Sequence, residues 1–149
     1  MRRLVLYADG AARGNPGPAG IGVVIEDEGG QVLQELSRFV GQKTNNQAEY
    51  LALIHGLEAA AEYQAEAIQI RLDSELLVYQ LKGEYKVKSP LLKPLRSQVQ
   101  KLLTRYKAVG IEHIERGDNQ MADKLANRAI DAALANKLTQ NPTFGDRLL

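Results

Sequence analysis

The first three apolar segments of the chain follow one another with only short connections between them. Residues 3–9 are apolar on both faces, residues 20–26 (GIGVVIE) form a second strand-like run, and residues 31–40 form a third. The DEGG sequence at 27–30 is a turn signal. Because short links join neighbouring antiparallel strands, the sequence predicts a three-stranded meander with residues 3–9 in the centre of the sheet.

The rest of the chain switches between helical and strand periodicity. Apolar residues recur at helical spacing over 45–63, and Thr44 with Gln47 has the pattern of a capping box at the start of that helix. Residues 67–73 (AIQIRLD) alternate strictly between apolar and polar, as in a half-buried strand. The remaining predicted elements are a helix at 74–82, a helix from about 91 to 107, a strand at 109–115 and a last helix that starts near Asn119.

The order βββ-α-β-α-α-β-α predicts a mixed α/β fold, a five-stranded mixed sheet with helices packed on it. The 149 residues fit one domain, which we expect to span 1–138, followed by a tail at 139–149. The absence of cysteine excludes a disulfide framework and a thiolate zinc site. No apolar run has the length of a signal peptide or a membrane span, so we expect a cytoplasmic protein.

Four acidic residues fall at the ends of predicted elements. Asp9 ends the first strand, Asp73 ends the fourth, and Glu49 and Asp123 lie in the first turns of the first and last helices. Strand ends with adjoining helix starts are where sites assemble on open sheets. Each acid alone has an ordinary explanation: an acid suits a helix N-terminus, Asp73 could cap the following helix, and Asp9 could be a turn residue.

Taken together, the four acids form a set of hard oxygen ligands with no thiol or imidazole beside them. Such a set suits Mg²⁺, with Mn²⁺ able to substitute. Without metal, several adjacent carboxylates would repel one another and take up protons. Two divalent ions about 4 Å apart would relieve this repulsion and could clamp the attacking and leaving oxygens of a phosphodiester.

A strongly basic segment runs from Lys82 to Lys107. It carries eight basic residues and one acid, so its net charge is +7, against +1 for the whole chain and −6 for the rest. This asymmetry is typical of a polyanion-binding strip, although a solvated helix face explains the charge equally well. Tyr79 and Tyr85 lie near the strip in sequence and belong either to it or to the core.

Four stretches of the chain resemble the successive blocks of the ribonuclease H type 1 family. They follow in order, with compatible spacing, over most of residues 3–134: YADGAARGNPGPAG, TNNQAEYLALIHGLEAA, IRLDSELLVYQLKGEYKVK and IERGDNQMADKLANRA. The resemblance implies the ribonuclease H-like fold and cleavage of the RNA strand of an RNA–DNA hybrid. It further implies two Mg²⁺ ions and products with 3′-hydroxyl and 5′-phosphate ends.

The resemblance also implies roles for individual residues. Its catalytic metal ligands carry over as Asp9, Glu49, Asp73 and Asp123. Its strand contacts carry over as Asn15 and Thr44 near a DNA phosphate, and Asn45 and Asn46 near the bases or sugars, although these could be turn and cap residues only.

The substrate chemistry points to further contacts. A protein that tells RNA from DNA must sense the 2′-hydroxyl, and the backbone from Gly10 to Gly14, with the side chains of Asn46 and Glu49, is our candidate sensor. The basic strip, including Lys86 and Lys88, is the candidate groove for the DNA strand. We expect little sequence preference, because phosphate and sugar contacts carry little base information.

Two other functions are alternatives to a hybrid nuclease. A non-catalytic nucleic-acid-binding module on the same fold has no reason to keep four clustered acids facing a polyanion. A related nuclease or strand transferase, such as a Holliday-junction resolvase, does not fit the GNPG and TNN blocks. Many family members carry a histidine in the loop before the last helix. Here that loop is RGDN, and we expect His113, in phase with Ile111, to be structural. We expect a monomer without a protein partner.

Overall fold

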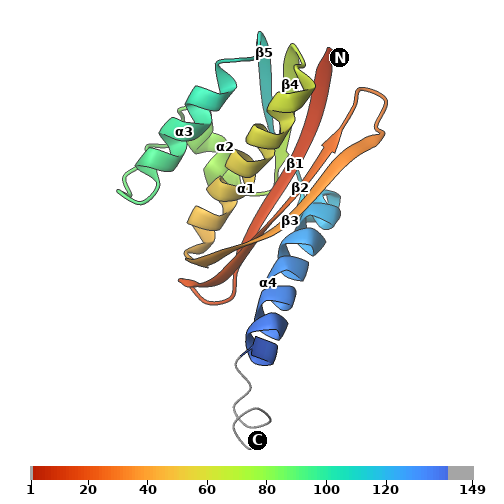
Figure 1. The fold of residues 1–149 in the computed structure, drawn as a ribbon. Coiled ribbons are helices and arrows are strands. Elements are labelled where there is room, and N and C mark those ends of the chain that lie inside the picture. Colours follow the sequence, from red (N-terminus) through yellow and green to blue (C-terminus); the bar gives the residue numbers. More distant parts are fainter. Residues whose placement is uncertain (1, 141–149) are drawn as a thin grey trace, which may run out of the picture.

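The computed structural model describes residues 2–140, which form one mixed sheet with helices packed against it (Figure 1). The sheet has five strands in the order β3-β2-β1-β4-β5, so the first strand of the chain lies at its centre, as predicted. The strands are β1 (Arg3–Ala12), β2 (Gly17–Glu26), β3 (Val32–Lys43), β4 (Ala67–Leu72) and β5 (Ala108–His113). The strand order and the helices between the strands confirm the predicted fold class.

The helices follow the predicted order with corrected ends. They are α1 (Asn45–Ala60) with the short 3₁₀ turn η1 (Ala61–Tyr63), α2 (Glu75–Leu81), α3 (Lys93–Leu103), the 3₁₀ turn η2 (Arg116–Asn119) and α4 (Gln120–Gln140). The helix predicted to end at 107 ends at Leu103, because the chain turns there: the Tyr106 amide donates to the Leu103 carbonyl at 3.1 Å. The RGDN segment, predicted as a loop, is the 3₁₀ turn η2.

The last helix extends into the segment predicted to be a tail. Helix α4 reaches Gln140, so the first two residues of the predicted tail at 139–149 belong to the helix, and the rest lie outside the described residues. Within residues 2–140, each helix is too short or too polar to cross a membrane.

The register of the sheet brings two of the acidic residues to one edge. Strand β1 is antiparallel to β2, with Asp9 opposite Gly22, and parallel to β4, with Ala8 opposite Leu72. Strands β4 and β5 are also parallel. The carboxyl end of β4 therefore lies beside Ala8 of β1, and Asp73, directly after β4, comes close to Asp9.

Helices α1 and α4 lie on opposite faces of the sheet. Helix α1 packs on β1 and β2, where Leu4 and Leu6 are completely buried, and α4 packs on β2, β3 and β1. Successive residues of a strand point to opposite faces, so Asp9 faces the α4 side and Gly10 the α1 side.

Two glycines allow both helices to approach the sheet beside Asp9. A Cβ atom at Gly10 would overlap the backbone of Ala48 in α1, and a Cβ atom at Gly22 would overlap the carbonyl oxygen of Ala122 in α4. The beginning of each helix is thus pressed against the sheet where β1 ends. This packing brings Glu49 and Asp123 to the edge that carries Asp9.

Candidate active site

The four acidic residues predicted from the sequence lie around the carboxyl end of β1. Asp73 follows β4 and Asp123 is in the first turn of α4, as predicted, whereas Asp9, predicted to end the first strand, lies within β1, which continues to Ala12. Glu49 is the fifth residue of α1, so it lies just beyond the first turn in which it was predicted. The alternative that Asp73 caps α2 is wrong, because the Ser74 hydroxyl accepts the Leu77 amide at 3.2 Å and is the cap.

The electrostatics of Asp9 show that the four carboxyl groups are neighbours. Burial is the largest influence on this group and, with the charge of Asp73, raises the pKa of Asp9 from 3.8 to about 8. Smaller contributions to the same rise in pKa come from a side-chain hydrogen bond with Asp123 and from the charges of Asp123 and Glu49. Asp9 is therefore the centre of the cluster, and without a cation it holds its proton near neutral pH.

Glu49 is held by a second set of contacts. Its Oε1 accepts a hydrogen bond from the Asn45 side chain at 2.6 Å, while its buried Oε2 has no partner among the described residues. Burial raises the pKa of Glu49 to about 7, helped by the charge of Asp73 and opposed by hydrogen bonds from Ser74 and Asn45 and by Arg116. One oxygen of this carboxylate is thus oriented, and the other is left free for a ligand.

The donor set was tested for its fit to a metal ion. It consists only of carboxylate oxygens, which Mg²⁺ and Mn²⁺ prefer, and the free buried Oε2 of Glu49 is an acceptor that a cation would satisfy. Within residues 2–140, however, no three histidine, cysteine or acidic side chains are already arranged as ligands of one ion. The four acids suit a divalent cation by their chemistry and by their closeness to one another, and their side chains would have to rearrange to converge on it.

The polar residues predicted to contact the strands have structural partners. The Asn15 side-chain oxygen accepts a hydrogen bond from the backbone amide of Asn45 at 2.9 Å, and Thr44 and Gln47 form the predicted capping box. Asn46 is exposed at the start of α1. Gly10 is buried against α1, so its closeness to Glu49 is explained by packing. The chain Asn15–Asn45–Glu49 links the glycine-rich turn to the acidic cluster, a link that the spacing of Asn45 and Glu49 could have indicated.

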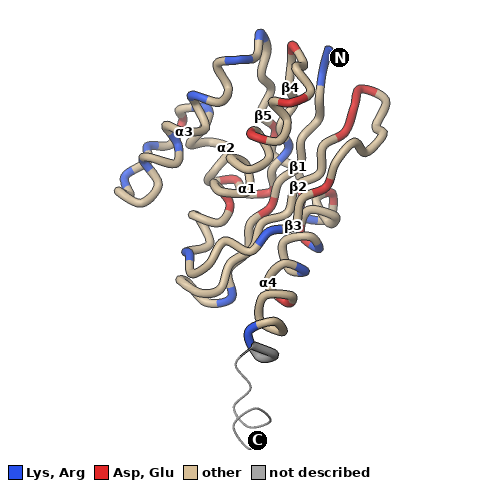
Figure 2. Tube along the Cα trace, viewed as in Figure 1, with Lys and Arg blue, Asp and Glu red and all other residues tan. Residues whose placement is uncertain are grey.

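The basic strip from Lys82 to Lys107 covers α3 and the loop before it (Figure 2). Lys86 and Lys88 are exposed in that loop. Tyr79 is half-buried and Tyr85 is exposed, and their rings pack with centroids 5.1 Å apart. These tyrosines thus lie at the edge of the core and border the strip. Among residues 2–140, Lys107 is the member of the strip that forms a salt bridge, with Glu66 at 3.7 Å. The strip is therefore largely available to a polyanion.

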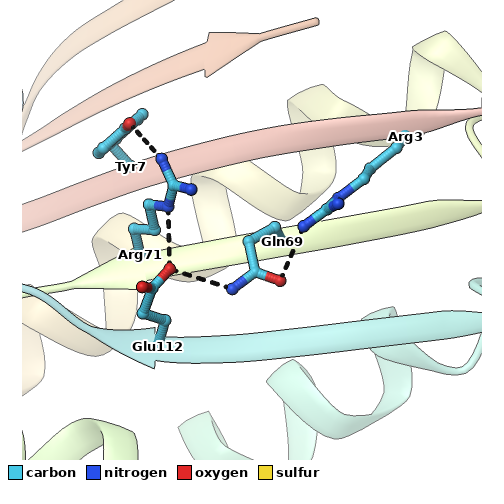
Figure 3. A network of polar contacts seen from close by, with 5 residues as sticks. All are labelled: Arg3, Tyr7, Gln69, Arg71 and Glu112. Carbon is cyan, nitrogen blue, oxygen red and sulfur yellow. Dashed lines mark hydrogen bonds and ion pairs between the residues drawn. The ribbon is translucent and has the colours of Figure 1, made fainter. Parts of the chain in front are cut away.

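A polar network that the sequence did not indicate ties together the three strands behind the site (Figure 3). Arg71 donates to the Tyr7 hydroxyl at 2.7 Å and to Glu112 at 3.0 Å. Gln69 accepts from Arg3 and donates to Glu112, each at 3.2 Å. The network cross-links β1, β4 and β5 on the face that Asp9 shares with Tyr7. The network depends on how the strands are aligned with one another, which the spacing of residues in the sequence does not reveal.

His113, before the RGDN segment, and Asn119, its last residue, have surroundings that the sequence did not indicate. His113 is in phase with Ile111, as predicted, but its side chain is exposed at the end of β5, so the structural role expected of it has no packing to support it. Asn119, near which the last helix was predicted to start, is buried, and its side-chain amide donates to the Ala8 carbonyl at 3.0 Å. Arg116 lies close enough to Glu49 to lower the pKa of that carboxyl.

Comparison with known proteins identifies the family. The reverse transcriptase-like family model matches residues 7–129. A ribonuclease HI of Halobacterium salinarum is 44% identical over 131 residues, covering 88% of this chain and 66% of its own length. The crystal structure of RNase H1 from that archaeon superposes with a TM-score of 0.85, covering 87% of this chain and 98% of the other.

A second solved relative, LC11-RNase H1, was crystallised in complex with an RNA/DNA hybrid. It is 46% identical, with a TM-score of 0.84, and the match covers 88% of this chain and 99% of that one. The chain spans between 36% and 66% of the length of the first curated relatives it matches. The family model and the fold nevertheless cover most of the chain, which belongs to the reverse transcriptase-like, ribonuclease H type 1 family.

Proposed function

We propose that this protein is an endonuclease that hydrolyses the RNA strand of RNA–DNA hybrids and leaves 3′-hydroxyl and 5′-phosphate ends. The observation that carries the proposal is the neighbourhood of Asp9 with Asp73, Asp123 and Glu49, each delivered by a different element. A cluster of like charges at the edge of a sheet has little value for folding, whereas it suits divalent cations. The similarity to LC11-RNase H1, which was crystallised with an RNA/DNA hybrid, supports the substrate class.

We assign the four carboxylates as the ligands of two Mg²⁺ ions, with Mn²⁺ able to replace them. When bound, the ions would supply the positive charge that activates water and stabilises the leaving oxygen. Asn45 orients Glu49 through its 2.6 Å hydrogen bond, and Ser74 supports the same carboxylate. Arg116, which lies beside Glu49, contributes a positive charge near the position of the scissile phosphate.

Substrate choice is assigned to two surfaces. The exposed side chain of Asn46, beside Glu49, is the proposed sensor of the RNA sugar, with the backbone of the Gly10–Gly14 turn. The exposed Lys86 and Lys88 of the basic strip hold the phosphates of the DNA strand. Asn15 and Thr44, already joined to the start of α1, are assigned to a DNA phosphate. The protein acts as a monomer in this proposal.

One gel tests the proposed activity. Labelled RNA–DNA hybrid, double-stranded RNA, double-stranded DNA and single-stranded RNA are each incubated with the protein, in Mg²⁺ and in EDTA. We expect cleavage of the RNA strand of the hybrid in Mg²⁺ alone, and none by Asp9→Asn. A folded wild-type protein that binds the hybrid but leaves it intact in Mg²⁺ and in Mn²⁺ would favour the non-catalytic binding module. Cleavage that persists in EDTA would contradict the metal assignment.

A further inference from the structure

We propose that Asn119 is a positioning residue that fixes the start of α4, and with it Asp123, against the end of β1 that carries Asp9. The inference rests on the proposed function, because it assigns a role in assembling the acidic cluster. The side chain of Asn119 makes its hydrogen bond to the backbone of β1 and not to one of the four carboxylates. The hydrogen bond that carries it joins residues 111 positions apart in the sequence.

The position of the bond is the first argument. The Asn119 Nδ2 donates to the carbonyl oxygen of Ala8 at 3.0 Å, and Ala8 immediately precedes Asp9. The pair Ala8–Leu72 is the last in the β1–β4 ladder, so the Asn119 amide binds β1 where its pairing with β4 ends. Asn119 also precedes the first residue of α4, whose first turn carries Asp123. One bond therefore joins the two segments that bear Asp9 and Asp123.

The burial of Asn119 is the second argument. The side chain is only 2% exposed, and its Oδ1 has no hydrogen-bond partner among residues 2–140. Its buried amide thus gains one hydrogen bond and leaves one acceptor unsatisfied, so the net contribution to stability is small. An apolar side chain of similar size would serve packing equally well. A directional bond to β1 is what asparagine adds at this position.

The packing of α4 completes the constraint. Gly22, the strand partner of Asp9, lies directly under the carbonyl of Ala122, so the first turn of α4 cannot move closer to the sheet. The Asn119 bond prevents the same turn from moving away from β1. Between these two contacts Asp123 has a fixed distance from Asp9, which is what two carboxylates that share metal ions require.

The test measures divalent-metal affinity as well as activity. Asn119→Leu removes the donor at similar size, and Tyr63→Phe is the control, because it removes one hydrogen bond, to Gln34 at 2.9 Å, at the opposite end of α1. Thermal unfolding is followed over a Mn²⁺ titration, and turnover on the hybrid over Mg²⁺ and substrate concentration. For Asn119→Leu we expect a metal half-saturation about 10-fold higher and a lower kcat, with KM for the hybrid unchanged. Tyr63→Phe keeps the wild-type metal response.

A double-mutant cycle separates positioning from a general loss of order. If Asn119 acts through Asp123, adding Asn119→Leu to Asp123→Asn produces no further loss of metal affinity. An unchanged metal half-saturation in Asn119→Leu, or fully additive losses in the cycle, would overturn the inference. If the leucine variant does not fold, Asn119→Ser takes its place with the same two criteria. A wild-type protein that shows no response to Mn²⁺ or Mg²⁺ would instead overturn the proposed function.

Discussion

Replacing Asp9 by asparagine is expected to stabilise the metal-free protein, in a manner that depends on pH. Asp9 lies in a cluster of acids, and burial with the charge of Asp73 raises its pKa from 3.8 to about 8. Between these two values the unfolded chain has released this proton while the folded protein keeps it. The folded state then binds more protons, so the free energy of unfolding falls as the pH rises from about 4 to about 8.

The magnitude follows from the same values. Each pKa unit corresponds to about 1.4 kcal/mol, so the change from 3.8 to about 8 sets an upper limit of roughly 6 kcal/mol above pH 8. Asp9 shares its environment with Asp73, Asp123 and Glu49, and its neutral replacement leaves three carboxylates in place. We therefore expect Asp9→Asn to recover only part of the limit, about 2 kcal/mol, equivalent to a rise in Tm of roughly 4–8 °C for a chain of this length.

The assay is thermal unfolding of both proteins in EDTA at pH 4 and pH 8.5, repeated in Mg²⁺. At pH 4 the two Tm values should be similar, because this pH is close to 3.8, the pKa of Asp9 in the unfolded chain, so most of the pH-dependent loss of stability develops only at higher pH. At pH 8.5 the variant should be more stable in EDTA, and Mg²⁺ should stabilise the wild type more than the variant. A variant less stable than wild type at pH 8.5, or a difference that is the same at both pH values, would refute the reasoning.

Three further predictions test the basic strip, the packing of α4 and the exposed histidine. Exchanging both Lys86 and Lys88 for alanine should weaken hybrid binding and reduce the slope of log affinity against log salt by about 2, with single-turnover rates at saturating substrate unchanged. An unchanged slope would show that the basic strip is a solvated surface that does not bind the hybrid. Gly22→Ala should lower the free energy of unfolding by about 1–3 kcal/mol in a denaturant titration, because its Cβ overlaps the Ala122 carbonyl. An unfolding transition identical to that of the wild type would show that α4 can shift to accommodate the added methyl group without loss of stability. His113→Ala should leave both Tm and turnover nearly unchanged, since the side chain is exposed; a hundredfold loss of turnover in the folded variant would assign this histidine to catalysis.

Local patterns predicted the elements whose identity depends on local physics. The alternation in 67–73 predicted β4, because its apolar positions Ile68, Ile70 and Leu72 are buried in the hydrophobic core. The capping box at Thr44 placed the start of α1 correctly, since both of its hydrogen bonds are formed within four residues. The end of α3 was misplaced because apolar spacing continues past Leu103, whereas the chain there turns back toward β5.

The acidic cluster could be predicted, but its supports could not. The acids are predictable because each falls near a predicted strand end or helix start, which is visible in the sequence. The bond from Asn119 to Ala8 and the network around Arg71 depend on register and on side-chain direction across the sheet. The sequence does not show that Gly22 must be a glycine, because the reason is its close contact with the backbone of Ala122 in α4. Long-range contacts of this kind have no periodic signature in one sequence.

The site combines groups that repel one another with contacts that prevent them from separating. Gly10 holds α1 close, and Gly22 and Asn119 hold α4, at the place where the charges of Asp9 and its neighbours oppose close approach. The scaffold therefore keeps the carboxylates together at a cost in stability that a bound cation would offset. Two variants are therefore expected to behave differently. Asp9→Asn should gain stability and lose metal binding, whereas Asn119→Leu should lose metal binding without that gain, so the pair distinguishes the repulsion between the ligands from the scaffold that holds them.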